Sequence, residues 1–453
     1  MEESVIPRSR GTTVSVAAAF LVVPLSAAPA AQAAPGPWSD PVTVLRSDPG
    51  FAGNLHWRLH VTTGDGGQVL VSTVTQIDDD SEGQLAYRAA ASAPYARTRP
   101  PQPGDYVDPA HLARRSDGSI VAVWTEAANV VSPFLVRTAT LSRAGRWSAA
   151  RTLGTGRAAG IDVDGRNTVH VAWTTEAGLV RVSTKRYHQA WSVPVKLGRG
   201  RVDRIDAARD GSAVIGYSDS ARSCSTGTRP DRFLVRSLSS SSGRWSGATT
   251  IHSTCSTSSG VARDVAAGPR GKVVAVVASS GGTYAFTRSA AGRAFGPKTR
   301  VRAGARQVAV EVGGDGVTTL AVVHADGSAA TTTQARGRMS WGGSTVLASR
   351  SAAVQGIDLA VTDAGDAVVA WKAGAGTGRH RVSITARTKA RGTSAWTTPR
   401  VLSRNAVTES DAATIRGWVD RGDGGSTAAA WYEADTAPGA SPGDLVVRVS
   451  SFG

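Results

Sequence analysis

The chain has 453 residues, 41% hydrophobic and only 19% charged, so it can bury a large core and is not a disordered polyanion or polycation. Its net charge of +16 favours acidic partners such as wall polymers, acidic polysaccharides or extracellular nucleic acid. Only six of the 51 basic residues are Lys, however, and an arginine bias from GC-rich coding would produce the same charge without any ligand.

Residues 1–33 have the features of a secretory signal peptide. Arg8 and Arg10 form a positive start, residues 14–25 are apolar, and residues 31–33 read Ala-Gln-Ala, a small-residue cleavage motif. The apolar run is too short to span a membrane. We therefore expect cleavage before Ala34, no membrane span, and a secreted, extracellular protein.

Residues 34–453 contain a repeat of about 50 residues, predicted to form one domain. Each unit has an apolar stretch, an Asp-Gly or similar turn, and a second apolar strand that usually ends in an aromatic residue. A polar loop, a third strand and a fourth strand opening on a Trp-Ser phrase follow. Four short strands at this period predict an all-β fold, a β-propeller of four-stranded antiparallel blades. The turn glycines are Gly66, Gly118, Gly165, Gly211, Gly271, Gly316, Gly365 and Gly424.

The two ends of the chain complete each other. The eighth unit stops after its third strand, residues 445–449, while residues 38–45 read like a fourth strand with no unit before them. We expect the N-terminal strand to close the ring, which would remove both open sheet edges. Eight blades follow, or seven if the first unit is not real, because its fourth strand near Pro94 to Pro100 has lost its Trp.

The Trp residues of the fourth strands are predicted to pack in the core rather than bind ligand. Their recurrence at one position in each unit is typical of packing between blades, where each would bury a large apolar area. They are Trp147, Trp191, Trp245, Trp341 and Trp396.

With these repeats, the chain resembles secreted bacterial β-propellers with sialidase-like, or BNR-type, repeats in degenerate form. That group includes sialidases, other glycosidases, lectins and non-catalytic surface proteins. The family's Asp-box, Ser/Thr-x-Asp-x-Gly-x-x-Trp, lies between third and fourth strands, whereas the Asp-Gly turns here lie between first and second. No arginine motif of the Phe-Arg-Ile-Pro type is present. The resemblance therefore identifies no catalytic residue.

Acidic residues recur where the second strand of a unit gives way to the third, on the rim where propellers commonly bind ligands. Such a rim could bind a cation or supply an acid and a base for glycosidic cleavage. Alternatively, these residues are polar hairpin positions copied by the repeat. The candidates are Glu126, Glu176, Asp219, Asp326 and Glu433. The recurrent third-strand arginines, such as Arg137 and Arg448, are predicted to be consensus positions that do not converge.

Two further features concern metals and redox chemistry. Asp78, Asp80 and Glu82 alternate before Gly83 as at the start of a calcium loop, but Ala89 stands where the twelfth-position Glu belongs, so a solvated loop is the alternative. No other cofactor is indicated, since the histidines form no metal motif. Cys224 and Cys255 are predicted to form a disulfide on the ligand rim.

Together these features predict a non-catalytic secreted propeller that binds a carbohydrate or an anionic wall or matrix polymer through one rim. The alternatives are a sialidase-like glycoside hydrolase and an extracellular protein-interaction scaffold. We expect a monomer, and no nucleic-acid partner.

Overall fold

The protein is described from a computed structural model, which places residues 38–46, 59–77, 80–101, 106–107, 110–129, 132–219, 231–254, 261–279, 281–374, 381–407, 419–421, 426–434 and 445–452. All of them belong to one compact unit, Pro37–Gly453, and the predicted signal peptide lies outside them. They contain no α-helix, so none that could cross a membrane, and three short 3-10 turns: η1 (Asp65–Gly67), η2 (Pro269–Gly271) and η3 (Arg350–Ala352).

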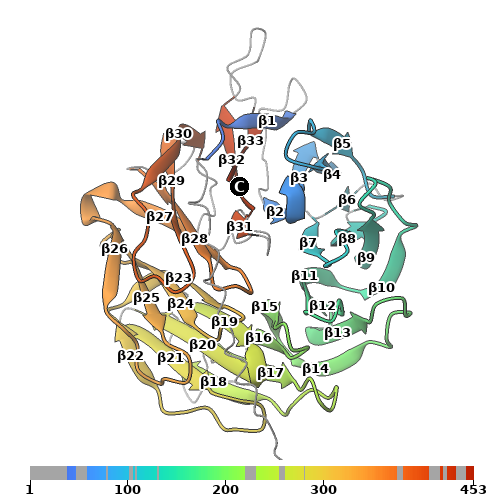
Figure 1. The fold of residues 1–453 in the computed structure, drawn as a ribbon. Coiled ribbons are helices and arrows are strands. Elements are labelled where there is room, and N and C mark those ends of the chain that lie inside the picture. Colours follow the sequence, from blue (N-terminus) through green and yellow to red (C-terminus); the bar gives the residue numbers. More distant parts are fainter. Residues whose placement is uncertain are drawn as a thin grey trace, which may run out of the picture. The chain divides into compact units, whose positions relative to one another are not determined.

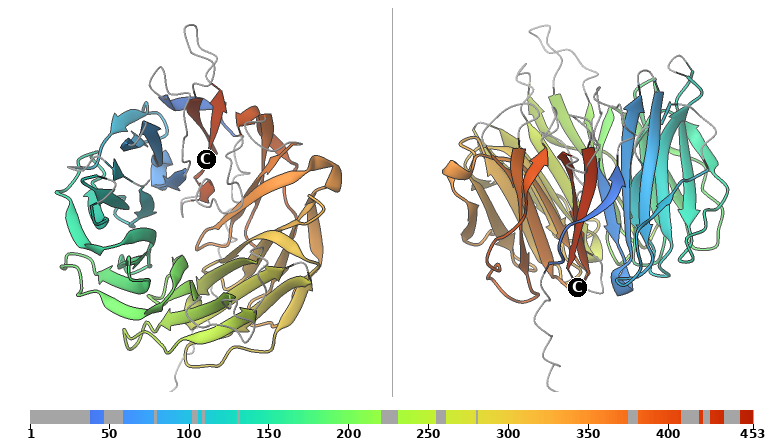
Figure 2. Two further views of the ribbon diagram at one scale, coloured as in Figure 1. Left: turned by 180° about the vertical axis from the view of Figure 1, so that it is seen from behind. Right: turned by 90° about the horizontal axis from the view of Figure 1, so that it is seen from above.

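The strands form eight four-stranded antiparallel blades in a ring, which confirms the predicted β-propeller (Figures 1 and 2). In each blade the first strand is innermost and the fourth is outermost. Two pairs of blades are also linked to each other. Ala406 of blade 7 pairs with Glu433 of blade 8, and the short strand β6 (Tyr106–Val107) bridges blades 1 and 2.

The first four blades contain strands β2 to β18. Blade 1 has β2 (His60–Thr63), β3 (Val69–Ile77), β4 (Asp80–Arg88) and β5 (Ala96–Thr98). Blade 2 has β7 (His111–Arg114), β8 (Ile120–Ala127), β9 (Leu135–Leu141) and β10 (Arg151–Thr155). Blade 3 has β11 (Arg157–Val163), β12 (Val169–Thr174), β13 (Leu179–Lys185) and β14 (Val195–Arg199). Blade 4 has β15 (Arg201–Ala207), β16 (Ala213–Asp219), β17 (Asp231–Leu238) and β18 (Thr249–Thr254).

The remaining strands form blades 5 to 8. Blade 5 has β19 (Ala262–Gly268), β20 (Lys272–Ser279), β21 (Gly282–Arg288) and β22 (Thr299–Arg302). Blade 6 has β23 (Ala305–Val312), β24 (Thr318–His324), β25 (Ala329–Gln334) and β26 (Ser344–Ala348). Blade 7 has β27 (Val354–Val361), β28 (Ala367–Ala373), β29 (Arg381–Lys389) and β30 (Arg400–Val407). Blade 8 has β31 (Val419–Arg421), β32 (Thr427–Ala434), β33 (Leu445–Phe452) and β1 (Val42–Arg46).

The repeat forms these strands for local reasons. The turn between the first and second strands needs a left-handed residue, and Gly118 takes φ +80° there while its N–H bonds the carbonyl of Arg115 at 3.0 Å. The second strand lies between its own neighbours and the adjacent blades. Every residue of β8 is therefore buried, as the apolar run of residues 120–124 predicts, and the polar Thr125 and Glu126 that follow are buried as well.

The N-terminal strand closes the ring as predicted. β1 pairs antiparallel with β33, with Val42 opposite Val449, and the N–H of Ser39 bonds the carbonyl of Ser451 at 2.7 Å. Trp38 is buried in the core cluster shared by blades 7, 8 and 1. Blade 1 is real, although its fourth strand β5 is only three residues long, so the ring has eight blades and not seven.

The fourth-strand Trp residues pack as predicted. All five are half-buried, and each lies against a hydrophobic cluster formed between two neighbouring blades. Trp147, for example, also donates from Nε1 to Thr98 Oγ1 of blade 1 at 2.7 Å. These residues hold the blades together.

Candidate functional site

The innermost strands surround a cavity of about 1360 Å³ along the ring axis. All eight blades contribute to its wall, from β2 to β31. Pockets for small organic molecules are usually about 300–1,000 Å³, so this cavity has room for a larger or extended ligand. Because side chains alternate along a strand, residues two apart on each inner strand face the channel.

Many carboxylates in this wall join one blade to the next. Asp162 Oδ2 accepts a hydrogen bond from the N–H of Ala207 at 2.7 Å, and Asp420 Oδ2 accepts one from the N–H of Thr63 at 2.7 Å. Four more side-chain oxygens accept a backbone N–H in the same way: Asp206 from Ala267, Asp264 from Val310, the amide oxygen of Gln307 from Ile357, and Asp358 from Val419. These hydrogen bonds cross the six consecutive blade junctions from blade 3 round to blade 1. The side chains that accept them therefore hold neighbouring blades together.

The other two junctions use hydroxyl groups on second strands. Ser72 Oγ accepts from the N–H of Ala110 at 3.1 Å, and Thr125 Oγ1 accepts from the N–H of Ala158 at 2.9 Å. On this side the channel wall carries His60 and His111, whose ring centroids are 4.5 Å apart. The wall therefore has a weakly charged side, blades 1 and 2, and a strongly charged side.

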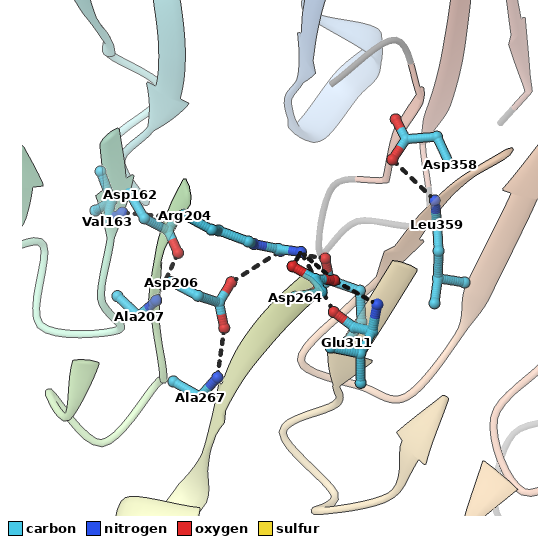
Figure 3. Close-up of polar contacts among 11 residues, drawn as sticks. Asp162, Val163, Arg204, Asp206, Ala207, Asp264, Ala267, Glu311, Asp358 and Leu359 are labelled. Atoms are coloured by element: carbon cyan, nitrogen blue, oxygen red, sulfur yellow. Dashed lines mark hydrogen bonds and ion pairs between the residues drawn. The ribbon is translucent and has the colours of Figure 1, made fainter. Parts of the chain in front are cut away.

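The strongly charged side centres on Arg204 (Figure 3). Its Nη1 lies 3.2 Å from both oxygens of Asp264, and its Nη2 lies 3.1 Å from Asp206 and also bonds Glu311. Burial opposes the charge of Arg204, but the three carboxylates outweigh burial and raise its pKa well above the ordinary value.

The carboxyl groups around Arg204 have raised pKa values. Burial raises the pKa of Glu311 to about 8, because the attraction of Arg204 only partly offsets the loss of water. Burial also raises the pKa of Asp206, and burial together with the charge of Asp206 raises the pKa of Asp162 to about 8. The channel can thus hold protonated carboxyl groups near neutral pH.

One mouth of the channel lies on the rim that carries the loops between second and third strands. Arg157 lies over the ring of Phe134 at 3.9 Å from its centroid, and Glu176 accepts from the N–H of Phe134 at 3.4 Å. Arg201 is exposed beside them. Arg263 bonds Ser218, so basic side chains from blades 3, 4 and 5 gather around an acidic interior.

The five predicted rim carboxylates lie where the repeat places them, but they do not gather. Glu126, 4% exposed, accepts from Trp124 Nε1 at 3.1 Å and lies 3.7 Å from Arg137. Glu433 has the same environment in blade 8, accepting from Trp431 Nε1 at 2.9 Å and from Arg448 at 3.1 Å. Glu126 and Glu433 are thus each held by the Trp and the third-strand arginine of their own blade, and Glu433 also accepts a hydrogen bond from Ser403 of blade 7.

The other three differ from one another. Glu176 is the one of the five that borders the channel cavity. Asp219 lies 3.7 Å from Arg232 of the same blade. Asp326 is exposed in the turn after β24, where hydrogen bonds from the side chain and backbone of Ser328 lower its pKa.

The predicted calcium and disulfide residues are only partly described. Asp80 and Glu82 lie in strand β4, paired with Ile77 and Thr75, rather than in a loop, because the hairpin continues that far. Asp78, Cys224 and Cys255 lie outside the described residues. Within the described part of the chain, no three His, Cys, Asp or Glu side chains are arranged to hold a metal ion.

The inner-strand carboxylates are the polar residues that the repeat pattern did not single out. A signal was present, because the dipeptide Ile-Asp recurs before the turn as Ile161-Asp162, Ile205-Asp206 and Ile357-Asp358. An acidic residue beside a strand-forming Ile, at one position of several units, indicates a shared structural contact. Arg204 and Glu311 do not recur from unit to unit, so the repeat gives no signal for them.

Several solved structures resemble this chain at low sequence identity. No family model and no curated protein matches the chain. Among solved structures, a six-bladed fucose-binding lectin of Aleuria aurantia is 13% identical, with 66% of this chain and 95% of that chain covered and a TM-score of 0.37. The polysaccharide lyase Uly1 is 9% identical, covering 92% and 99% with a TM-score of 0.44. A protein of unknown function from Dyadobacter fermentans is 12% identical, covering 92% and 98% with a TM-score of 0.39. These likenesses concern the propeller alone.

Proposed function

We propose that this protein is an exported, non-catalytic β-propeller that binds a carbohydrate in its central channel. The channel cavity carries the proposal, because it is large, polar and open to ligand-sized molecules from the rim that holds Glu176. Carbohydrates offer many hydroxyl groups, and the wall offers arginine, carboxylate, threonine and histidine partners for them.

The charge of the cavity wall indicates which class of glycan the channel would bind. Nine acidic side chains and six arginines line the cavity, and the pKa values of two of these acids, Asp162 and Glu311, are raised to about 8, so the wall has no excess of positive charge although the whole chain carries +16. The excess of basic residues therefore lies outside the channel. A neutral or amine-bearing glycan suits the interior better than a polyanion, whereas an anionic wall or matrix polymer would bind the outer surface.

Within this proposal the residues of the mouth make the first contacts. Glu176 and Arg201 are exposed, and the Arg157 side chain presents a flat guanidinium supported by Phe134. The deeper aspartates hold neighbouring blades together, so they form the wall and contribute shape and charge.

A sialidase-like glycoside hydrolase is the second candidate, favoured by one observation. Glycosidases pair a protonated carboxyl group with an ionised one. Glu311, whose pKa burial raises to about 8, shares Arg204 with Asp206. Asp206 and Asp264 also accept a backbone N–H from the next blade, whereas among the described residues Glu311 accepts none. Glu311 would then be the general acid.

The test is a glycan array probed with residues 34–453 at low and physiological salt, with release of free sugar followed in the same wells. We expect salt-resistant binding of a neutral or amine-bearing glycan and no release. Glu176→Gln should weaken binding about tenfold, as loss of one charged hydrogen bond does, while the exposed-turn control Asp326→Asn should not. Binding of polyanions alone, lost at physiological salt, would contradict a channel site. Sugar release abolished by Glu311→Gln would favour the hydrolase instead.

Export and the disulfide are parts of the proposal with their own test. Intact mass of protein recovered from the medium should begin at Ala34. Alkylation before and after reduction should modify Cys224 and Cys255 only after reduction. A mature chain that retains residues 1–33, or cysteines that alkylate at once, would contradict these two points.

A further inference from the structure

Arg115 occupies a turn position where the repeat does not need an arginine. Its N–H bonds the carbonyl of Ser119, four residues on, in the turn between the first two strands of blade 2. The same bond marks the equivalent residue in five other blades, where that residue is Gly64, Asp164, Ala208, Gly313 or Thr362. The same turn therefore forms with shorter side chains, so the geometry of the turn does not explain why residue 115 is an arginine.

The guanidinium of Arg115 is buried and incompletely paired. The residue is 6% exposed, and neither Nε nor Nη2 has a hydrogen-bond partner. A buried donor without a partner costs about 1–3 kcal/mol, so such groups are rare in folded proteins. Nε and Nη2 form one edge of the guanidinium plane, whose two parallel N–H groups match two oxygens of a carboxylate, sulfate or phosphate.

The surroundings of Arg115 come from blades 2 and 3 and are basic. Its Cζ lies 5.9 Å from the ring centroid of Tyr187, in the turn between β13 and β14. Lys185 ends β13, and burial together with the charges of Arg115 and Arg151 lowers its pKa, which places these three cations near one another. Asp117 is the acidic residue of this group.

The carboxylate of Asp117 has other partners. Its Oδ1 accepts from the N–H of Ser119 at 2.8 Å, and its Oδ2 accepts from the hydroxyl of Tyr187 at 3.0 Å. Asp117 attracts Arg115 electrostatically but forms no hydrogen bond with its Nε or Nη2. Arg115 thus lies near a carboxylate that is already bonded elsewhere, while the cation Lys185 lies close to Arg115.

We propose that Arg115, with Lys185 beside it, binds an oxyanion at the junction of blades 2 and 3, on the rim opposite the channel mouth. The bound group is a sulfate, a phosphate or the carboxylate of an acidic sugar, held side-on by Nε and Nη2. Tyr187, 37% exposed, lies over this guanidinium and moves aside to admit the anion. The site is independent of the proposed channel function.

The test uses inorganic sulfate as the probe, with titration calorimetry in a sodium chloride background of constant ionic strength. Wild type should bind sulfate, and Arg115→Gln should weaken binding about tenfold or more, the effect of removing charged hydrogen bonds. Arg115→Lys keeps the charge without the planar edge and should also weaken binding. The matched control Arg146→Gln, an exposed arginine of the same blade, should bind like wild type.

A second variant and a direct observation complete the test. Asp117→Asn still accepts from Ser119 at Oδ1 and can donate from Nδ2 to the Tyr187 hydroxyl oxygen, but it removes the competing charge, so sulfate should bind it several-fold more tightly. Crystals of wild type soaked in selenate should show its anomalous signal between Arg115 and Lys185. Equal sulfate affinity in wild type and Arg115→Gln, or selenate elsewhere only, would overturn the proposal. Binding that disappears at physiological salt would show an adventitious ion only and would overturn it as well.

Discussion

Replacement of Arg204 by Met tests whether the charged side of the channel is balanced by this single arginine. Met fills a similar length but leaves Asp206, Asp264 and Glu311 without their shared cation. Removing one partner of a buried ion pair costs about 3–5 kcal/mol. Because the Arg204 side chain is 19% exposed, water screens part of this loss, and we expect about 3 kcal/mol at pH 8.

The pH dependence separates charge from packing. In wild type, burial raises the pKa of Glu311 to about 8, so the stability that its protonated form contributes is present below pH 4.5 and is lost as pH rises towards 8. Without Arg204 the pKa values of Glu311 and Asp206 rise further, because the charge of Arg204 lowers both in the wild type. The loss in the variant should therefore shrink to about 1 kcal/mol at pH 5.

The assay is urea unfolding of wild type and variant at pH 5 and pH 8, followed by tryptophan fluorescence. A thermal melt at pH 8 would report the same loss as a fall in Tm of about 3–4 °C, at about 2 cal/mol/K of unfolding entropy per residue in a unit the size of Pro37–Gly453. Arg201→Met, at the exposed start of the same strand, is the control and should change stability by less than about 0.5 kcal/mol. An equal loss at both pH values would refute the electrostatic account.

Three further predictions concern the ring. Glu311→Gln should flatten the fall in stability between pH 4.5 and 8, measured by the same unfolding series, because Gln cannot ionise; an unchanged slope would assign that fall to other groups. Asp420→Ala should cost about 2–3 kcal/mol, since the N–H of Thr63 loses its acceptor at the closing junction, and Asp420→Asn should cost less; equal losses in the two variants would argue against that hydrogen bond. Trp38→Ala should cost about 3–5 kcal/mol and loosen β1, so size-exclusion chromatography should detect new oligomers through the exposed edge of β33; an unchanged monomer peak with unchanged stability would contradict closure by the N-terminal strand.

The fold was predictable because each blade repeats the same local solution. Three features recur at a period of about 50 residues: glycine at turns such as Gly118, apolar runs in second strands such as residues 120–124 of β8, and one Trp in most units. Ring closure was predictable for the same reason, since an incomplete last unit and a strand around Trp38 with no unit before it match each other. The short β5 shows the limit of the repeat signal, because its pairing with β4 persists without the Trp.

The candidate site was only partly predictable. Glu126 and Glu433 were expected on a shared rim, and they lie at the ends of equivalent strands. Each carboxylate contacts the Trp and the arginine of its own blade, and Glu433 also contacts Ser403 of blade 7. A repeat pattern identifies the strand end on which a residue lies. Its side-chain partners depend on packing that the pattern does not contain.

The sequence by itself therefore determined a ring of seven or eight four-stranded blades and the order of strands in each blade, because these depend on short-range patterns repeated along the chain. The structure decided on eight blades, and in the turn of blade 3 it gives the left-handed position to Asn167, at φ +60°, and not to Gly165. Only the tertiary structure decided which charges meet. Arg204 contacts Glu311, 107 residues away, and Asp420 contacts Thr63, 357 residues away. Such contacts exist because ring closure brings the inner strands of distant blades around one axis, where burial alters their pKa values.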